Sequence, residues 1–333
     1  MEQNAFFQAF LGSLVADAVS MPVHWYYNTA ALDEDYGVIQ GYQKPKNPHP
    51  DSILWRSRFV PKSDEANILH AHAKYWGQRN IHYHQDLESG ENTLNFRLAC
   101  ELYQMVASQG RYDEVAWLTH YVECMRTPGW NRDTYLEEYH RAFFDNLASG
   151  KPLLKCGIDD KHIGGLSSVP ALLAVLSAIA DDTEDQTCEC ILGHVNLTHK
   201  NQTVLQSTRS LVKILQGLKA GESLDALLQK HANAFVSLKR FEKWSHRPDR
   251  EVIGRVMSPA CYIEDSFPAS LYLAWKYQGD FDAGIRANAM VGGDNCHRGV
   301  VVGSILGLIN GVSAVWLDGL KCLPGLKELE NAG

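Results

Sequence analysis

The sequence predicts an all-α fold, formed by a single compact domain that spans residues 1–333. Apolar residues recur at helical spacing along most of the chain, and no run of alternating apolar and polar residues with hairpin turns indicates a sheet. Near the C-terminus, glycines recur every fourth residue at positions 299, 303, 307 and 311 of an apolar stretch. Four-residue spacing places them on one helix face, where another helix can approach closely.

The elements follow in order. The first segment has Gly12, Ala16 and Ser20 in steps of four, and residues 20–63 form an irregular region rich in proline and aromatic residues. Long ordered loops of this kind often carry function. Later segments show apolar stripes at helical spacing, as do Val204 and Leu211 in one of them. The ranges expected to be helical are 3–19, 64–78, 92–108, 112–125, 133–148, 168–180, 185–195, 200–219, 222–233, 265–276, 280–290 and 295–311.

Composition excludes several classes of protein. The net charge of −8 argues against a nucleic acid as partner. Residues 299–317 lack formal charge, but they contain Asn310 and two serines, so a helix buried in a protein core is expected and no membrane partner. The N-terminus lacks the basic start of a signal peptide, and the eight scattered cysteines form no CxxC pair. We therefore expect a cytoplasmic protein with reduced thiols. The sequence leaves the oligomeric state open.

The turn 292–299 presents the densest group of reactive side chains. Two glycines lead into Asp294, Cys296 and His297 at the start of the glycine-striped helix. A helix N-terminus has unpaired N–H groups and the positive end of the dipole, which suit an anion or a thiolate. The alternative is a simple helix cap made by Asp294 or Asn295.

Polar residues upstream are candidates for the same site. Asp17 lies at the end of the first helix, where the dipole disfavours a carboxylate, so a partner is expected, with a solvated side chain as the alternative. Glu91 and Asn92 precede the helix expected at 92–108, where Asn92 has the alternative role of a cap. His82 and His84 hint weakly at a metal, and exposed loop histidines are the simpler expectation.

Taken in order, these segments resemble the ADP-ribosylglycohydrolase family. That family includes ADP-ribosyl-dinitrogen-reductase hydrolases, ADP-ribosyl-acceptor hydrolases and the J1 crystallins of jellyfish. Its motifs read G-D-A-L-G-x-P-x-E, T-D-D-T and G-G-D-T-D-T. The resembling segments are Gly12–His24, Gly90–Thr93, Leu197–His199, Glu264–Leu271, Asp280–Arg286 and Gly292–Gly303.

The resemblance implies an all-α fold with a cleft that holds two magnesium ions. In such enzymes the metals bind ribose hydroxyls of an ADP-ribosyl group while carboxylates assist cleavage of the glycosidic bond. Asp17, Thr93 and Asp294 match the motifs. Asn92, however, stands at an aspartate position, and Cys296 replaces another.

The other departures are His297 at the position of a small hydroxyl residue and His24 at that of a glutamate. A standard two-magnesium site is therefore not expected. We expect at most one divalent metal, either magnesium or a softer ion such as zinc, with Glu91, Thr93 and Asp294 as ligands.

Three functional interpretations follow. In the leading one, the chain hydrolyses a glycosidic or related bond in a small-molecule, nucleoside-like or ADP-ribosylated substrate. Glu91 and Asp294 then share acid–base work. In the second, Cys296 is a nucleophile with a lowered pKa and His24 is its base. In the third, the chain is an inactive ligand-binding or crystallin-like structural member.

The expected site brings together residues from several segments. Five side chains should line one cleft, walled partly by aromatic residues of region 20–63: Glu91, Asn92, Asp294, Cys296 and His297. The catalytic candidates are Glu91, Asp294 and Cys296, and the candidates for substrate binding are Asp17, His24, Asn92 and His297.

Overall fold

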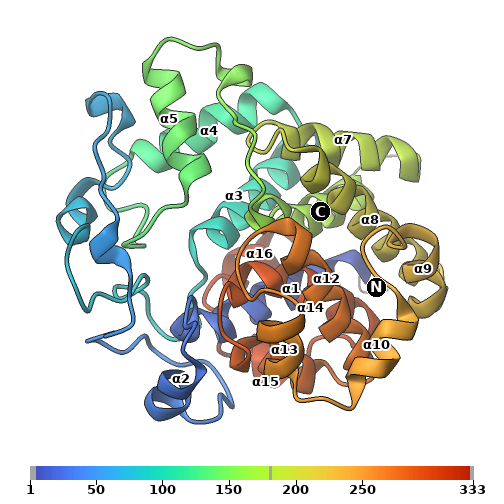
Figure 1. Cartoon of the computed structure of the whole chain (residues 1–333). Coiled ribbons are helices and arrows are strands. Elements are labelled where there is room, and N and C mark those ends of the chain that lie inside the picture. The colour runs from blue at the N-terminus through green and yellow to red at the C-terminus, as the bar shows by residue number, and fades with distance from the viewer. Residues whose placement is uncertain (1–4, 180–181, 331–333) are drawn as a thin grey trace.

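The computed structural model describes residues 5–179 and 182–330, and helices make up its regular structure (Figure 1). Within those residues β-structure is limited to isolated bridges, such as the one between Ile158 and His199. The expected all-α fold is confirmed. The α-helices are α1 (Ala5–Ser20), α2 (Thr29–Tyr36), α3 (Leu94–Gln109), α4 (Glu114–Arg126), α5 (Glu138–Ala148), α6 (Val169–Ile179), α7 (Glu184–Asn196), α8 (Gln202–Lys219), α9 (Leu224–His231), α10 (Leu238–Ser245), α11 (Asp249–Glu251), α12 (Ile263–Lys276), α13 (Phe281–Met290), α14 (Asn295–Asn310), α15 (Ala314–Leu317) and α16 (Leu323–Glu330).

Helices α1 and α14 form the centre of the molecule, and both are almost entirely buried. Their backbones touch where Gly12 meets Gly303. A Cβ atom added to Gly12 would lie 2.1 Å from the carbonyl oxygen of Gly303, and one added to Gly303 would lie 2.2 Å from that of Gly12. Only glycine permits this approach. The expected role of the glycine stripe is confirmed, and its partner is the first helix, which carries the small residues at the same spacing.

Other helices surround this pair. Helices α12 and α13 pack against α14, and α6 packs against α1, so that one apolar core runs through them. The segment between α2 and α3 is largely irregular and extends to one side, where blue passes into cyan in Figure 1. It carries several of the aromatic residues that reach the site.

Most expected helices are present, with ends shifted by a few residues. The expectation for 64–78 is wrong, since only short 3-10 helices form there, at Asp64–Ala66 and His70–Tyr75. His70 has a φ of 48°, and this left-handed conformation interrupts a helix. In the irregular region a short helix, α2, was not foreseen. The expected starting residues 3 and 4, and the expected end at residue 180, lie outside the described residues.

The described residues include one helical segment long and apolar enough to cross a membrane, Ala5–Val23, and 94% of its most apolar window is buried inside the protein. The uncharged stretch 299–317 is divided, because α14 ends at Asn310. The part of that stretch that belongs to α14 is buried up to Gly307 against α1 and its neighbours, as expected.

Candidate active site

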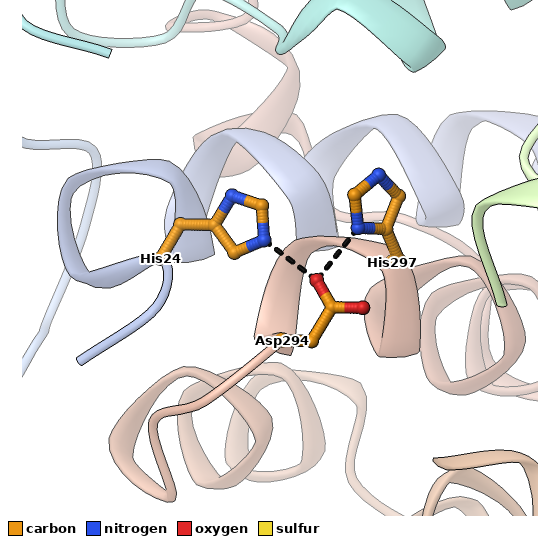
Figure 2. A group of neighbouring side chains, drawn as sticks. All are labelled: His24, Asp294 and His297. Atoms are coloured by element: carbon orange, nitrogen blue, oxygen red, sulfur yellow. Dashed lines mark hydrogen bonds and ion pairs between the residues drawn. The ribbon is translucent and has the colours of Figure 1, made fainter. Parts of the chain in front are cut away.

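Asp294 is held at the start of α14 by contacts that do not cap the helix. Gly292 and Gly293 have positive φ values and turn the chain into the helix, and Asp294 occupies the capping position. Its carboxylate makes no capping hydrogen bond. One oxygen, Oδ1, instead accepts from His24 Nε2 at 2.7 Å and from His297 Nδ1 at 2.6 Å (Figure 2). Asp294 and both rings are fully buried.

The second oxygen of Asp294 is free. Oδ2 has no hydrogen-bond partner, and in Figure 2 no dashed line joins it to either ring. His162 Nε2 is 3.9 Å from it. A buried carboxylate oxygen without a partner is costly, so it marks a position where a further donor is expected to bind.

The hydrogen-bonded chain extends in both directions from Asp294. On one side, His24 Nδ1 lies 2.7 Å from His84 Nε2, and His84 Nδ1 lies 2.7 Å from Asp133 Oδ1. On the other side, His297 Nε2 lies 3.2 Å from Glu137 Oε1 and 2.9 Å from the amide nitrogen of Asn95. Three carboxylates are thus joined through three imidazole rings, all of them buried.

The charges of this chain alternate. Burial opposes a charge on His297, but Asp294 and Glu137 outweigh it and raise the pKa of His297 to about 10. Burial likewise opposes ionisation of the two carboxyl groups, yet the His297 imidazolium lowers the pKa of Glu137 and, together with His24, that of Asp294. Burial lowers the pKa of His24 to about 3 despite the neighbouring Asp294. The raised pKa favours a protonated His297 between two carboxylates, even though the Asn95 amide nitrogen also contacts its Nε2 at 2.9 Å. The lowered pKa of His24 favours a neutral ring beyond Asp294.

A cleft of about 330 Å³ opens beside this chain of residues. Its walls are aromatic: Trp25, Tyr27, Tyr83, Tyr135 and Tyr262. The rings of Tyr83 and Tyr135 meet Trp25 edge-on, with centroids 4.9 and 5.0 Å away. Trp25 itself stacks on the buried ring of His24 at 3.8 Å. The walls therefore touch the hydrogen-bonded chain directly.

Backbone strain fixes the position of Trp25. Its φ is 61°, a conformation that costs a bulky residue about 1–3 kcal/mol. The N–H of Trp25 donates to the carbonyl of Gly293 at 2.8 Å, and Gly293 N–H donates to Tyr26. These bonds join the end of the first helical segment to the turn before α14. They set the aromatic wall over the Asp294 carboxylate.

The floor of the cleft is acidic. Glu137, Glu138 and Asp160 line it together with His162 and Cys261. Glu137 is 6% exposed, and its Oε1 accepts from the side-chain amide of Asn95 at 3.1 Å, whereas Oε2 has no hydrogen-bond partner. His140 Nε2 lies 3.8 Å from Oε2, beyond hydrogen-bond distance. Glu137 thus lines a ligand-sized cavity and keeps one buried oxygen without a hydrogen-bond partner.

His162 faces the cleft in a defined tautomer. Its Nδ1 accepts the backbone N–H of Gly164 at 2.9 Å, so Nε2 carries the proton when the ring is neutral. Burial lowers the pKa of His162, which favours that neutral ring. His162 therefore donates from Nε2, toward Asp294 Oδ2 or toward a bound molecule.

Asp17 lies in a separate cluster. Its Oδ2 accepts from Asn92 Nδ2 and from the backbone N–H of Thr93, each at 2.9 Å, and its Oδ1 accepts from Thr93 Oγ1 at 2.8 Å. The expected partner for Asp17 therefore exists, and it is the N-terminus of α3. Burial raises the pKa of Asp17. Asn92 does not cap α3, as the simple alternative supposed, because its side chain binds Asp17 and the Leu14 carbonyl.

Cys296 belongs to the Asp17 cluster too. It is fully buried beside Met21 and Leu87, with its Sγ 3.7 Å from the backbone oxygen of Asp17. Burial, followed by the nearby Asp17 and Asp294 carboxylates, raises the pKa of Cys296 well above its usual value. The expected lowering by the helix N-terminus is wrong, because desolvation and negative neighbours outweigh the dipole.

Glu91 does not join Asp294. Its Oε1 pairs with Arg132 at 2.7 Å and its Oε2 accepts the backbone N–H of Glu88 at 2.7 Å. In the turn before α3, Glu91 and Asn92 project in different directions, so only Asn92 reaches the buried cluster. The expected convergence of five side chains in one cleft is therefore wrong. Asp294 and His297 stay together, and the aromatic walls from region 20–63 are present.

Several site residues were missed by sequence reasoning. Asn95 lies in the first turn of α3, three residues after Asn92, which gave a usable signal, and His162 is followed closely by a glycine pair. Glu137 has no local signal, since only the fold brings it to His297. His82 and His84 were expected to be exposed, but both are buried.

Three groups of described side chains have atoms close enough to share a metal ion. They are His24, Asp294 and His297; His162, Cys261 and Asp294; and Glu101, His120 and Cys124. The ligand set expected for magnesium, Glu91, Thr93 and Asp294, does not converge, because Glu91 pairs with Arg132 and Thr93 binds Asp17.

The residues present do not fit two magnesium ions. Magnesium requires several converging oxygen ligands, and at Asp294 only one carboxylate is present among imidazoles. In the first group the contacts of 2.6–2.7 Å are those of hydrogen bonds. In the second, the Nδ1 of His162 accepts a backbone N–H, which leaves the proton on the nitrogen that would bind a metal.

Comparison with known proteins identifies the family. The family model described as ADP-ribosylglycohydrolase matches residues 2–332. Among curated proteins no sequence matches. A solved structure described as "ADP-ribosylglycohydrolase-related protein complex" shares the fold, with a TM-score of 0.63 and 18% identity over 98% of this chain and 95% of that chain. With a family match over almost its whole length, the chain belongs to the ADP-ribosylglycohydrolase family.

Proposed function

We propose that this chain is a hydrolase that cleaves a glycosidic bond without a divalent metal. The observation that carries the proposal is the Glu137–His297–Asp294 triad beneath an aromatic cleft. In it, one oxygen of Glu137 is buried, ionised and unpaired where a ligand would bind. The substrate is a nucleoside-like or ADP-ribosyl-like small molecule, or a protein that carries such a group.

The chemistry follows from charge. Cleavage of a glycosidic bond passes through an oxocarbenium-like transition state with positive charge at the anomeric carbon. Glu137 Oε2 stabilises that charge and orients the attacking water. The Nε2–H of His162 donates to the substrate. Asp294 acts through His297 as a positioning residue, because it fixes the imidazolium that keeps Glu137 ionised.

The His297 imidazolium takes the electrostatic place of a bound cation. Two buried carboxylates this close would otherwise repel each other, and one of them would be protonated. An internal cation removes that repulsion and leaves both carboxylates ionised.

The eight unpaired thiols further support a reducing compartment such as the cytoplasm.

The test compares two glutamates. Glu137→Gln should leave the fold intact and lower turnover at least a hundredfold, the scale on which a charged catalytic group acts. The matched control, Glu91→Gln, should stay within threefold of wild type, because Glu91 does not line the cleft and instead contacts the half-exposed Arg132 and the backbone N–H of Glu88. The assay is a panel of nucleosides, ADP-ribosylated peptides and ADP-ribose esters, run with and without EDTA.

The opposite ranking would remove the proposal. Loss of turnover in Glu91→Gln with full activity in Glu137→Gln would return the catalytic role to Glu91. Complete loss with EDTA, restored by magnesium, would show that a metal performs the work assigned to His297. No turnover on any member of the panel would favour the inactive, ligand-binding alternative.

A further inference from the structure

The aromatic side chains around the cleft form a partial cage. Trp25, Tyr83 and Tyr135 meet edge-on and form the inner wall, while Tyr27 and Tyr262 stand at the mouth, 49% and 61% exposed. Aromatic rings that line a cavity can offer an electron-rich face to a bound molecule. Such faces attract organic cations, most strongly when the ligand is desolvated.

The polar side chains of the cleft are acidic. Glu137, Glu138 and Asp160 line it, and its twelve lining residues, all within the described ranges, include neither lysine nor arginine. Glu137 Oε2 is buried and has no hydrogen-bond partner, so it is an acceptor kept for a ligand. Aromatic faces and an unpaired carboxylate therefore act together on one cavity.

No lysine or arginine lines the cleft to bind a phosphate group, although Arg56 and Arg58 flank the lining residue Ser57 in sequence. The nearby Lys161 is paired with Glu264, and Arg298 is fully buried with its Nη1 on the carbonyl of Pro259 at 3.1 Å. The positive end of helix α5 reaches the cleft, but Glu137 and Glu138 occupy its capping and first positions. Anion sites at helix N-termini need free N–H groups and no competing carboxylates.

We propose that this cleft binds an organic cation without phosphate groups. Resting on the hydrolase function proposed above, the inference makes the substrate a cationic N-glycoside, a sugar joined to a positively charged nitrogen heterocycle. Water adds its oxygen to the anomeric carbon as the C–N bond breaks. The bond's electron pair returns to the nitrogen, the heterocycle leaves neutral, and one proton passes to solvent. Such a leaving group needs no proton from the enzyme.

The experiment measures binding to matched rings of different charge. Isothermal titration compares 1-methylnicotinamide, nicotinamide and nicotinate, which carry +1, 0 and −1. The cation should bind at least tenfold more tightly than the neutral ring, and the anion should bind least. Raising the salt concentration should weaken only the cation's binding. Nicotinamide riboside should bind more tightly than its 5′-phosphate.

Variants assign the effect to the cleft. Asp160→Asn and Glu137→Gln should each weaken binding of the cation roughly tenfold and leave the affinity for the neutral ring unchanged. Tyr262→Leu should weaken it about threefold, while Tyr262→Phe, which keeps the ring, should not. Glu242→Gln, on the exposed face of α10, is the matched control and should change nothing.

The outcomes separate this inference from the proposed function. Equal affinity for cation and neutral ring, or a preference for the phosphorylated nucleoside, would overturn it. Selective binding of 1-methylnicotinamide with no hydrolysis of nicotinamide riboside would support the cation site and remove the hydrolase.

Discussion

Asp17 and Asp294 are buried carboxylates of the central helix pair, and each lies at a helix N-terminus. Their hydrogen-bond partners and the shifts of their pKa values differ. At α3, Asp17 is surrounded by neutral donors that satisfy both of its oxygens, and burial raises its pKa. At α14, Asp294 gives one oxygen to two histidines, keeps the other free, and has a lowered pKa. Both residues match motifs of the family. The difference shows that the surroundings, and not the motif, separate a carboxylate whose oxygens are both satisfied from one that keeps an oxygen unpaired.

The two neighbourhoods also differ in what lies beyond them. Around Asp17 the next residues are apolar, namely Met21, Leu87 and the buried thiol of Cys296. Around Asp294 the imidazoles lead on to Glu137 and a cleft. Asp17, whose oxygens are both hydrogen-bonded, fixes the packing of α3 on α1. Asp294, which is hydrogen-bonded to two histidines and keeps one oxygen unpaired, can respond to a ligand.

Exchanging each aspartate for asparagine gives the largest contrast. Asp294→Asn should lower turnover at least tenfold, and the alkaline limb of the pH–rate profile should move to lower pH, because His297 loses a counter-charge. Asp17→Asn should keep turnover within twofold per folded molecule. It should cost about 1–3 kcal/mol of stability, since an amide N–H₂ then faces the donors of α3. Turnover and thermal unfolding of both variants are the measurements. Loss of turnover in Asp17→Asn with normal turnover in Asp294→Asn would contradict the comparison.

The pH dependence of stability should sharpen the comparison between the surroundings of Asp17 and those of Asp294. The pKa of His297 is raised to about 10, so its contribution to stability is complete below about pH 6.5 and is lost as pH rises toward 10. The pKa of His24 is lowered to about 3 and that of His140 to about 4, so protonation of these buried rings destabilises the fold as pH falls below 6.5. The melting temperature should therefore peak near pH 6.5. In His297→Gln the alkaline decline should be shallower, and an unchanged decline would argue against a buried imidazolium.

The smallest expected effect concerns the thiol. Cys296→Ala should leave turnover within twofold and cost about 1–2 kcal/mol of stability through the small cavity it creates. Iodoacetamide should label the native protein elsewhere before it reaches Cys296, which is fully buried with a raised pKa. Peptide mapping after labelling measures the order. Loss of activity in a folded Cys296→Ala protein would restore the nucleophile interpretation.

The fold was largely predictable because local signals and packing agree. The glycine stripe at 299–307 and the small residues of the first helix each indicate close approach, and they meet at Gly12 and Gly303. The helix expected at 64–78 does not form, because His70 adopts a left-handed conformation that no short sequence pattern reveals.

The site was predictable only in part. Asp294, His24 and His297 were named, and the structure brings them into contact. Glu137 could not be named, because its role depends on the packing of α5 beside His297 and not on its neighbours in sequence. Glu91 was misplaced because one residue in a turn decides whether a side chain points inward or outward.

The most direct test of the account is the protonation state of His297. Long-range ¹H–¹⁵N NMR of the EDTA-treated protein, assigned by the signals absent from His297→Gln, reports whether one or both ring nitrogens carry a proton. We predict that both nitrogens are protonated at pH 8, as in an imidazolium held between Asp294 and Glu137. A neutral ring with a single protonated nitrogen at that pH would contradict the claim that this family member supplies its own internal cation.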